Sequence, residues 1–534
     1  MIAAAGALTS AAAYVLLFAP YEQSWLGWVA LVPLFLVLDG APPRRASAAS
    51  ALWAALATAG VVGWLVPTLR DHFGLGAAAS GLVLLGLAVT AAAPWCALAF
   101  AAAAATARRL PPAAGPLLLA AAFVAAEFAR TELGIRSPWA RLGDAFYGAE
   151  RLRQMAALGG VYAVTGVVAL SSAALARSLS RLVRNPEGGL RSAAGWAALA
   201  AAVPLLALGH GELRNRRVAP AEGAPLRVLL VQGNVPPELR WSRRSAHRVL
   251  RRYQRLTLAG LRKRPLPDLI VWPENAIQTA PDDPVYGPPV VRVASGVPLL
   301  LGAPRSELRG GTRHHFNSAH LLHPDGRREH YDKRRLLPLG EAPLFGGVLR
   351  FGRRGDLDAD VYTPGSRPGI FRVGGRRLAV LICFEALYPE LAREAATLGA
   401  ELLVNLSNDG WYRGRGGAGQ HLAQAVFRAV ETGLPLVRAT TTGISAVISP
   451  DGELLASLGE RQPGTLRVEV PLPRGRTAYA ATGDLFAGVA AGLVLSGPVV
   501  ALAGRLRKRR SRPVAAGAAP GAPRPDGPGR SASA

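Results

Sequence analysis

The sequence predicts a polytopic α-helical membrane domain of about eight spans with an inserted α/β domain. Three observations favour this fold class. Residues 1–210 and 483–504 consist mainly of alanine, leucine, valine and glycine, with charges confined to short islands. Residues 224–475 have the composition of a water-soluble α/β protein. The whole chain of 534 residues is 50% hydrophobic and yet carries a net charge of +26, a combination rare in soluble nucleic-acid-binding proteins.

Eight apolar stretches have about the 20 residues that a helix needs to cross a bilayer. They cover residues 2–20, 24–39, 48–68, 77–106, 111–129, 155–176, 193–209 and 483–504. Buried helices of a large soluble protein are the alternative, which so many uncharged stretches in series disfavour. The first stretch could also be a cleaved signal peptide, but no lysine or arginine precedes it.

Basic residues between the spans predict the orientation in the membrane, because they concentrate in cytoplasmic loops. Basic residues follow the second, fourth, sixth and eighth stretches: Arg44, Arg45, Arg108, Arg109, Arg177, Arg181, Arg184, Arg191, Arg505, Arg507, Lys508, Arg509 and Arg510. This pattern places both termini in the cytoplasm and residues 224–475 outside. Two other arginine-rich segments, after the fifth stretch and just before residue 224, do not follow the alternation.

The inserted segment alternates short β-rich runs with helix-like segments. The runs "LRVLLVQGN", "DLIVWPEN", "PLLLGAPRS", "RLAVLICFE", "ELLVNLSND" and "LPLVRATTTG" each end in polar or turn residues. Segments such as "SAHRVLRRYQRLTLAGLRK" and "QHLAQAVFRAVETG" have a helical pattern. We therefore expect a layered α/β domain with its functional site at the strand ends. Beyond the last span, residues 511–534 are rich in Pro, Gly, Ala and Ser and are expected to be disordered.

Three reactive groups follow predicted strands or hairpins: Glu274, Lys333 and Cys383. Taken singly, each has an ordinary explanation, since a glutamate can be a solvated turn residue, a lysine part of a wet surface and a cysteine core filling. Together they meet the needs of a cysteine nucleophile, which requires a base for its proton and positive charge for the developing oxyanion. This chemistry needs neither a metal nor a cofactor. The other cysteine, Cys96, lies within an apolar stretch.

Five histidines between residues 314 and 330 could suggest a metal site. They lack a recognisable zinc spacing, so we interpret them as strand and loop residues. They are His314, His315, His320, His323 and His330.

The motifs "WPEN", "YDKRRLLPLGE", "ICFE" and "NLSNDGW", in this order, resemble the nitrilase-like carbon–nitrogen hydrolase superfamily. With "VQGNVPPELRW", "QHLAQAVFRAVETGLPLVRATTTG" and the flanking spans, the chain is similar to the membrane-bound members of that superfamily, the apolipoprotein N-acyltransferases. The resemblance implies an αββα sandwich for residues 224–475 and a Glu-Lys-Cys triad. In that triad Glu274 is the general base, Lys333 stabilises the oxyanion and Cys383 is the nucleophile.

The same resemblance implies supporting roles around the triad. Glu341, Phe384 and Glu385 match supporting active-site positions, and Trp241 resembles a substrate-binding tryptophan on a mobile loop. Three features depart from the family pattern. Phenylalanine stands at position 384 where tyrosine is common, "GEAPLF" places its proline differently, and "TTTG" replaces an asparagine-rich turn.

The activity implied is the transfer of an acyl chain from a membrane phospholipid, through a cysteine thioester, to the N-terminal amine of a diacylated apolipoprotein. The setting implied is the bacterial cytoplasmic membrane, with the catalytic domain on its outer side. One alternative keeps the triad in a membrane-tethered nitrilase or amidase that uses water as the acceptor. Another is a transporter or scaffold, which the scarcity of ionisable residues in the spans disfavours. A basic lipid- or nucleic-acid-binding protein is a third, although most arginines flank spans.

Overall fold

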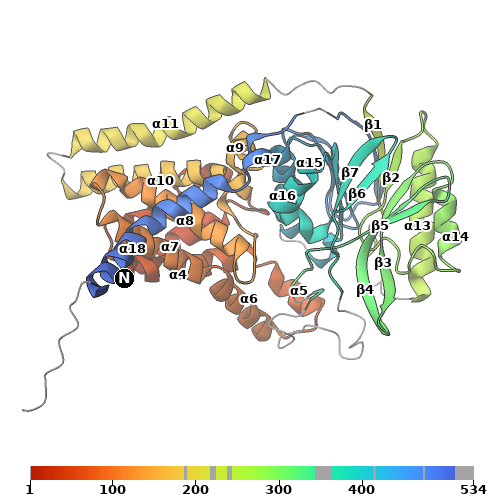
Figure 1. The fold of residues 1–534 in the computed structure, drawn as a ribbon, viewed down its shortest axis with the longest axis horizontal. Helices are drawn as coiled ribbons and strands as arrows, with labels where there is room; N and C mark the ends of the chain where they lie inside the picture. The colour runs from red at the N-terminus through yellow and green to blue at the C-terminus, as the bar shows by residue number, and fades with distance from the viewer. Residues whose placement is uncertain are drawn as a thin grey trace, which may run out of the picture.

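The computed structural model describes residues 2–185, 189–216, 224–236, 243–338, 340–342, 362–412, 416–472 and 475–510. Apolar helices lie at one end of this elongated molecule and an α/β sandwich lies at the other (Figure 1). The predicted tail, residues 511–534, lies outside the described residues.

All eight apolar stretches are helical over most of their length. The helices of this part are α1 (Ile2–Val15), α2 (Gly27–Ala30), α3 (Val32–Leu38), α4 (Pro43–Val61), α5 (Leu65–Asp71), α6 (Ala77–Ala91), α7 (Ala93–Ala107), α8 (Gly115–Glu132), α9 (Ala156–Gly159), α10 (Val161–Arg184), α11 (Leu190–Asn215), α17 (Ala478–Thr482) and α18 (Leu485–Arg510). Within the described ranges, five helices are long and apolar enough to cross a membrane, or six if the bent pair α4–α5 counts as one span.

The first two predicted spans form shorter apolar helices, Ile2–Val15 and Ser24–Leu38. Composition alone did not reveal their breaks: the first helix ends at Val15 although the apolar stretch continues to residue 20, and the second includes a 3₁₀ turn before Pro33. The third predicted span bends by 56° between α4 and α5.

Small residues let the central helices approach closely. A Cβ added at Gly166 of α10 would lie 2.8 Å from the ring of Phe486 on α18, so any larger residue there would require the ring to shift. About two thirds of the apolar window of α10 is buried in the protein (67%), against 11% of that of α11. Helix α10 is therefore central to the bundle, whereas α11 lies along its outside (Figure 1).

The described residues of the inserted domain form two six-stranded sheets. In the first, the strand order is β12-β1-β2-β3-β4-β5, and in the second it is β11-β10-β9-β8-β7-β6. The strands are β1 (Leu226–Gln232), β2 (Leu269–Val271), β3 (Leu299–Arg309), β4 (Thr312–Leu322), β5 (Arg328–Asp332), β6 (Ile370–Val373), β7 (Arg376–Ile382), β8 (Leu402–Ser407), β9 (Leu436–Thr440), β10 (Ser445–Ile448), β11 (Leu454–Leu458) and β12 (Gly464–Val470). In each sheet three central strands are parallel, β1–β2–β3 and β7–β8–β9.

Helices cover the outer face of each sheet, which completes the αββα sandwich that the resemblance implied. Helices α13 (Arg243–Leu261) and α14 (Gly287–Val293) cover the first sheet, and α15 (Pro389–Thr397) and α16 (Gly417–Thr432) cover the second (Figure 1). Aliphatic side chains such as Val271, Val380 and Val404 fill the space between the sheets. The fold class is thus the predicted one.

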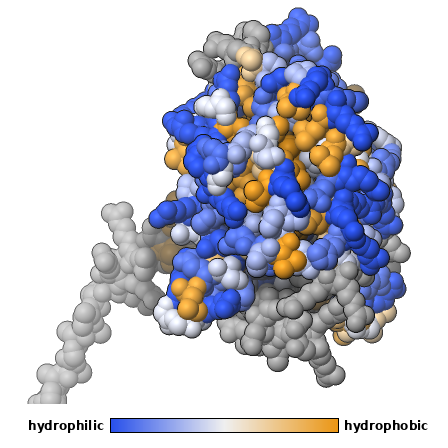
Figure 2. Space-filling model, turned by 90° about the vertical axis from the view of Figure 1, so that its right-hand side faces the viewer, coloured by the Kyte–Doolittle hydropathy of each residue, from blue (hydrophilic) through white to orange (hydrophobic). Residues whose placement is uncertain are grey.

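The two parts share one hydrophobic core. The core cluster of the membrane helices continues without interruption into α15, α16 and the outer face of the second sheet. At the opposite end, the face of the sandwich shown in Figure 2 is largely hydrophilic, with separate apolar patches. The sandwich therefore binds the helices through the second sheet, and the strand ends that carry Cys383 lie on that side.

Candidate active site

Cys383 lies at a sharp turn between strand β7 and a 3₁₀ helix, Cys383–Leu387. Its φ angle is +50°, in the left-handed region that residues with a side chain rarely occupy. Backbone strain of this kind costs about 1–3 kcal/mol and persists only where neighbouring contacts hold the residue in place. A cysteine held this way at a strand end is a candidate nucleophile.

Glu274 and Lys333 lie together beside the thiol. Glu274 follows β2, and Lys333 follows β5 directly. The Lys333 ammonium Nζ lies 3.3 Å from Oε1 of Glu274 and 2.8 Å from Oε2 of Glu341. Glu274, Lys333 and Glu341 are nearly or fully buried, each residue being at most 9% exposed. A glycine at position 302 on β3 permits this arrangement, because a Cβ there would meet the Glu274 backbone at 2.5 Å.

Asn317 on β4 joins the two carboxylates. Its Nδ2 group donates to Oε1 of Glu274 and to Oε1 of Glu341, each at 2.7 Å. The second carboxylate oxygen of Glu274, Oε2, is buried and accepts no hydrogen bond among the described residues. A carboxylate fixed through one oxygen and free at the other can accept a proton, as a general base must.

The electrostatics of this cluster keep the resting thiol neutral and the lysine charged. Burial and the Glu274 carboxylate raise the pKa of Cys383, against the opposing effect of Lys333. Burial alone would lower the pKa of Lys333, but the carboxylates of Glu341 and Glu274 outweigh it and raise that pKa well above its ordinary value. Cys383 therefore needs a base at the moment of attack, and Lys333 is available as a permanent positive charge.

Glu385 connects the nucleophile turn with the lysine segment. Its Oε2 accepts the backbone N–H of Ile382, and its Oε1 accepts the Tyr331 hydroxyl and the backbone N–H groups of Arg334 and Arg335, all between 2.7 and 3.1 Å. Burial raises the pKa of this carboxyl group, and these donors oppose the rise. Glu385 is therefore a positioning residue, which holds Ile382 just before Cys383 and the backbone of Arg334 just after Lys333.

A second buried network supports the nucleophile from behind. The Cys383 carbonyl oxygen lies 3.2 Å from Nε2 of His421 and accepts from Nδ2 of Asn405 at 3.4 Å. Burial and the neighbouring Arg438 lower the pKa of His421, which favours the neutral ring. In turn, Arg438 Nη2 donates to Oδ2 of Asp409 at 2.7 Å and lies 3.1 Å from Nδ1 of His421. These contacts hold the strained turn in place.

Cys383 opens onto an apolar cavity of about 190 Å³ between the two parts of the protein. The sandwich contributes Phe384, Trp411 and Tyr412 to its lining, among others. The membrane part contributes residues of α5 and α6 and two tryptophans, Trp64 and Trp139. The rings of Trp139 and Phe384 are stacked, with centroids 6.4 Å apart. Walls that are so largely apolar suit a hydrocarbon chain better than a small amide.

The structure brings together six of the seven residues that the sequence singled out. Glu274, Lys333 and Glu341 form one cluster with Asn317, while Glu385 fixes the turn that carries Cys383 and Phe384. Trp241 lies outside the described residues.

Five further residues contribute to the site although no sequence motif identified them. A polar residue within a buried strand was the available signal for Asn317, and "QHLAQAVFRAVETG" contained His421 without indicating its partner. The residues are Asn317, Tyr331, Trp139, Asp409 and His421.

Comparison with known proteins adds two family matches. The family model of the carbon–nitrogen hydrolases matches residues 262–480, and that of the apolipoprotein N-acyltransferase N-terminal domain matches residues 10–174. An apolipoprotein N-acyltransferase from Geobacter metallireducens is 31% identical over 471 residues, covering 86% of this chain and 88% of that protein. One from Caulobacter vibrioides is 32% identical over 483 residues, covering 86% and 87%. A solved amidase from Nesterenkonia sp. is similar with a TM-score of 0.36 and 22% identity, covering 48% of this chain and 93% of that one.

Proposed function

The chain belongs to the family of apolipoprotein N-acyltransferases, and on this premise we propose that it moves an acyl chain from a membrane phospholipid to the N-terminal amine of a diacylglyceryl-cysteine on an apolipoprotein. The intermediate is a thioester on Cys383. One observation carries the proposal: the thiol opens onto an apolar cavity whose walls come partly from membrane helices. A water-soluble amide would gain little from such walls, whereas an acyl chain drawn out of the bilayer would lose about 0.8 kcal/mol for each CH₂ group that the walls did not keep from water.

In the first half-reaction, Oε2 of Glu274 accepts the proton from Sγ of Cys383 as the sulfur attacks the ester carbonyl carbon. The carbonyl oxygen becomes an oxyanion, and Lys333 Nζ and the backbone N–H of Phe384 stabilise it. Collapse of this intermediate breaks the ester C–O bond. The lysophospholipid leaves with the proton that Glu274 held, and the acyl group remains on sulfur.

In the second half-reaction, the amine of the acceptor attacks the thioester carbon and gives a proton to Glu274. Collapse breaks the C–S bond, an amide forms, and the sulfur regains its proton from Glu274. Asn317 and Glu341 hold the base and the lysine in register through both steps, which their hydrogen bonds to Glu274 and Lys333 support. The apolar lining limits access of water, which would otherwise hydrolyse the thioester.

We assign catalysis to residues 224–475 and membrane anchoring to residues 1–210 and 483–504. Both substrates are anchored in a bilayer, so a site formed jointly by the sandwich and membrane helices spares most of the cost of extracting a chain. The arginines that follow alternate spans support a catalytic domain on the outer side of the cytoplasmic membrane.

The test is the intact mass of the detergent-purified protein after incubation with a phospholipid of defined acyl chains. We expect wild type to gain one acyl mass that hydroxylamine removes, and Cys383→Ala to gain none. Adding a diacylated lipopeptide should discharge the adduct onto the peptide. If folded wild type forms no adduct at any incubation time, the phospholipid donor is wrong; release of free acid or ammonia from small amides would then favour the tethered amidase.

A further inference from the structure

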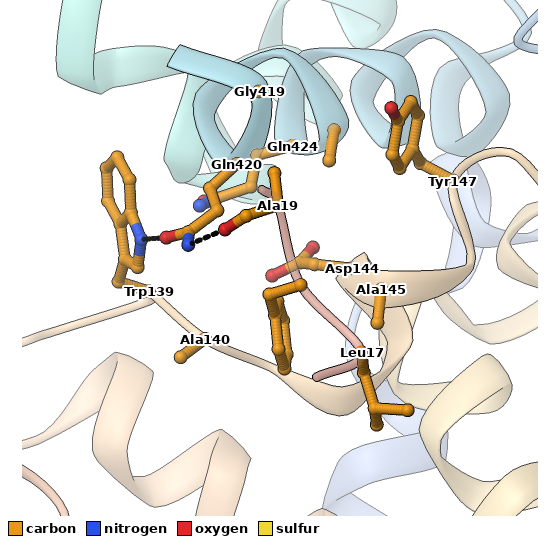
Figure 3. A pocket seen from close by; sticks show the side chains of 12 residues that line it. Leu17, Ala19, Trp139, Ala140, Asp144, Ala145, Tyr147, Gly419, Gln420 and Gln424 are labelled. Carbon is orange, nitrogen blue, oxygen red and sulfur yellow. Dashed lines mark hydrogen bonds between the residues drawn. The ribbon is translucent and has the colours of Figure 1, made fainter. Parts of the chain in front are cut away.

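Gln420 on α16 makes hydrogen bonds that link the sandwich to three separate segments of the membrane part. Its side-chain oxygen Oε1 accepts the indole N–H of Trp139 at 2.6 Å and that of Trp64 at 3.1 Å. Its Nε2 group donates to the carbonyl oxygens of Ala19 at 2.8 Å and Val61 at 3.1 Å. Figure 3 shows the amide between Trp139 and Ala19. The side chain is 5% exposed, and every donor and acceptor position of the amide is used.

Two of these partners belong to the bend in the membrane helix. Val61 is the last residue of α4, so its carbonyl has no partner in the continuing helix turn, and Trp64 immediately precedes α5. A break in a membrane helix is tolerated where another group replaces the lost hydrogen bonds. Gln420, from the catalytic side, supplies that donor and so ties the angle of the bend to the position of α16.

The indole of Trp139 lines two spaces. One is the cavity onto which Cys383 opens, and the other is a small pocket that Leu17, Asp144 and Gln420 also line (Figure 3). The rings of Phe384, Tyr412 and His421 pack around the indole, and the hydrogen bond to Gln420 sets the direction of its N–H. The contact between Trp64 and Trp139, with ring centroids 5.1 Å apart, links the second indole to the same amide.

We propose that Gln420 is the positioning residue that sets the shape of the acyl cavity and, through Trp64 and Trp139, determines which acyl chain lengths fit beside Cys383. The proposal rests on the proposed function for the identity of the natural chain. The shape of the cavity itself can be tested without that function, because Cys383 is a thiol that chemical probes can reach through the same space.

The chain offers a matched pair of substitutions. Gln420→Met preserves length and removes all four hydrogen bonds. Gln424→Met makes the same change one helical turn away, at a side chain that is 1% exposed, whose Oε1 has no hydrogen-bond partner among the described residues. Gln424 also lines the small pocket (Figure 3) but not the Cys383 cavity. If Gln420→Met fails to fold, Trp139→Phe removes a single indole donor and serves as the second variant.

Two assays are run on each protein in detergent. In the first, a series of N-alkyl maleimides of increasing alkyl length labels Cys383, and peptide mass analysis separates this label from any at Cys96. In the second, phospholipids of increasing acyl length form the thioester. We expect wild type and Gln424→Met to share one length preference. In Gln420→Met, the ratio of the reaction rates of the best and worst chain lengths should fall by about tenfold. Trp139→Phe should lie between them.

The outcomes separate the two proposals. In one outcome, wild type shows a length preference in the maleimide assay that Gln420→Met loses, but no phospholipid forms a thioester in wild type. That outcome would support the role of Gln420 in shaping the cavity and refute the phospholipid donor. A Gln420→Met or Trp139→Phe protein that keeps the wild-type length ratio in both assays would overturn the role of Gln420. So would a flattening of the same size in Gln424→Met.

Discussion

Substituting Glu385 by glutamine tests how far the two halves of the site depend on one buried carboxylate. Glutamine retains Oε1 as an acceptor for Tyr331 and the backbone N–H groups of Arg334 and Arg335. It replaces Oε2, which accepts the N–H of Ile382 at 2.7 Å, with an NH₂ group that cannot accept. One charge-assisted hydrogen bond is lost, and a buried N–H loses its partner.

The loss of such a bond costs about 1.5–3 kcal/mol. Part of this cost is offset, because glutamine also removes the cost of burying a charge, the same burial that raises the pKa of Glu385. We therefore expect a net destabilisation of about 2 kcal/mol. The unpaired N–H belongs to the residue before Cys383, so the strained turn should relax. A displacement of about 1 Å at a reacting group can slow a reaction about 100-fold.

The assay measures the thermal unfolding midpoint in detergent and the rate of thioester formation on the same preparations. Glu394→Gln is the matched control, since Glu394 pairs with the side chain of Arg334 at 41% exposure and should matter little. We expect Glu385→Gln to unfold a few degrees earlier and to form the thioester at least tenfold more slowly. A Glu385→Gln protein indistinguishable from Glu394→Gln in both measurements would refute the positioning role.

Three further predictions concern the groups around the thiol. Lys333→Met should slow thioester formation by about 10²–10³, because the oxyanion loses its charged partner, and mass analysis of the acyl-enzyme measures this; a rate within threefold of wild type would contradict it. Asn317→Leu leaves Glu274 and Glu341 without their bridging donor and should lower the same rate with no change in the acyl-length preference, which a series of phospholipids checks. Finally, because the pKa of Cys383 is raised, its alkylation by iodoacetamide should still be rising with pH above the ordinary thiol pKa of about 8.5, and a plateau near neutral pH would argue against a neutral resting thiol.

Much of this fold and part of the site could be predicted from the sequence because the signals are local. Apolar stretches long enough to span a bilayer identify helices, and short β-rich runs that end in polar residues identify the strands that present Glu274 and Cys383. The breaks in the first two membrane helices could not be read in this way, since each apolar run continues through its break.

The contacts between the two parts of the chain lay beyond any local pattern. Gln420 lies 281 positions from Trp139 and 356 from Trp64 in the sequence. Nothing in "QHLAQAVFRAVETG" indicates that Gln420 forms hydrogen bonds with a bent membrane helix. Asn317 needed the pairing of β3 with β4 and the fold of the whole first sheet before its amide could reach Glu274. Sequence motifs specify which groups react, whereas tertiary packing decides what surrounds them.

The contrast between α10 and α11 has a consequence for how this protein can change over time. Helix α10 has 67% of its apolar window buried, and its Gly166 lies against Phe486 of α18, whereas α11 has only 11% of its apolar window buried in the protein. Most positions of α11 therefore accept any apolar side chain. In a library covering every single substitution, α11 should accept exchanges among Leu, Val, Ile and Phe freely, while enlargements such as Gly166→Leu are eliminated. The sequence of the lipid-facing helix α11 should therefore vary more than that of the packed helix α10.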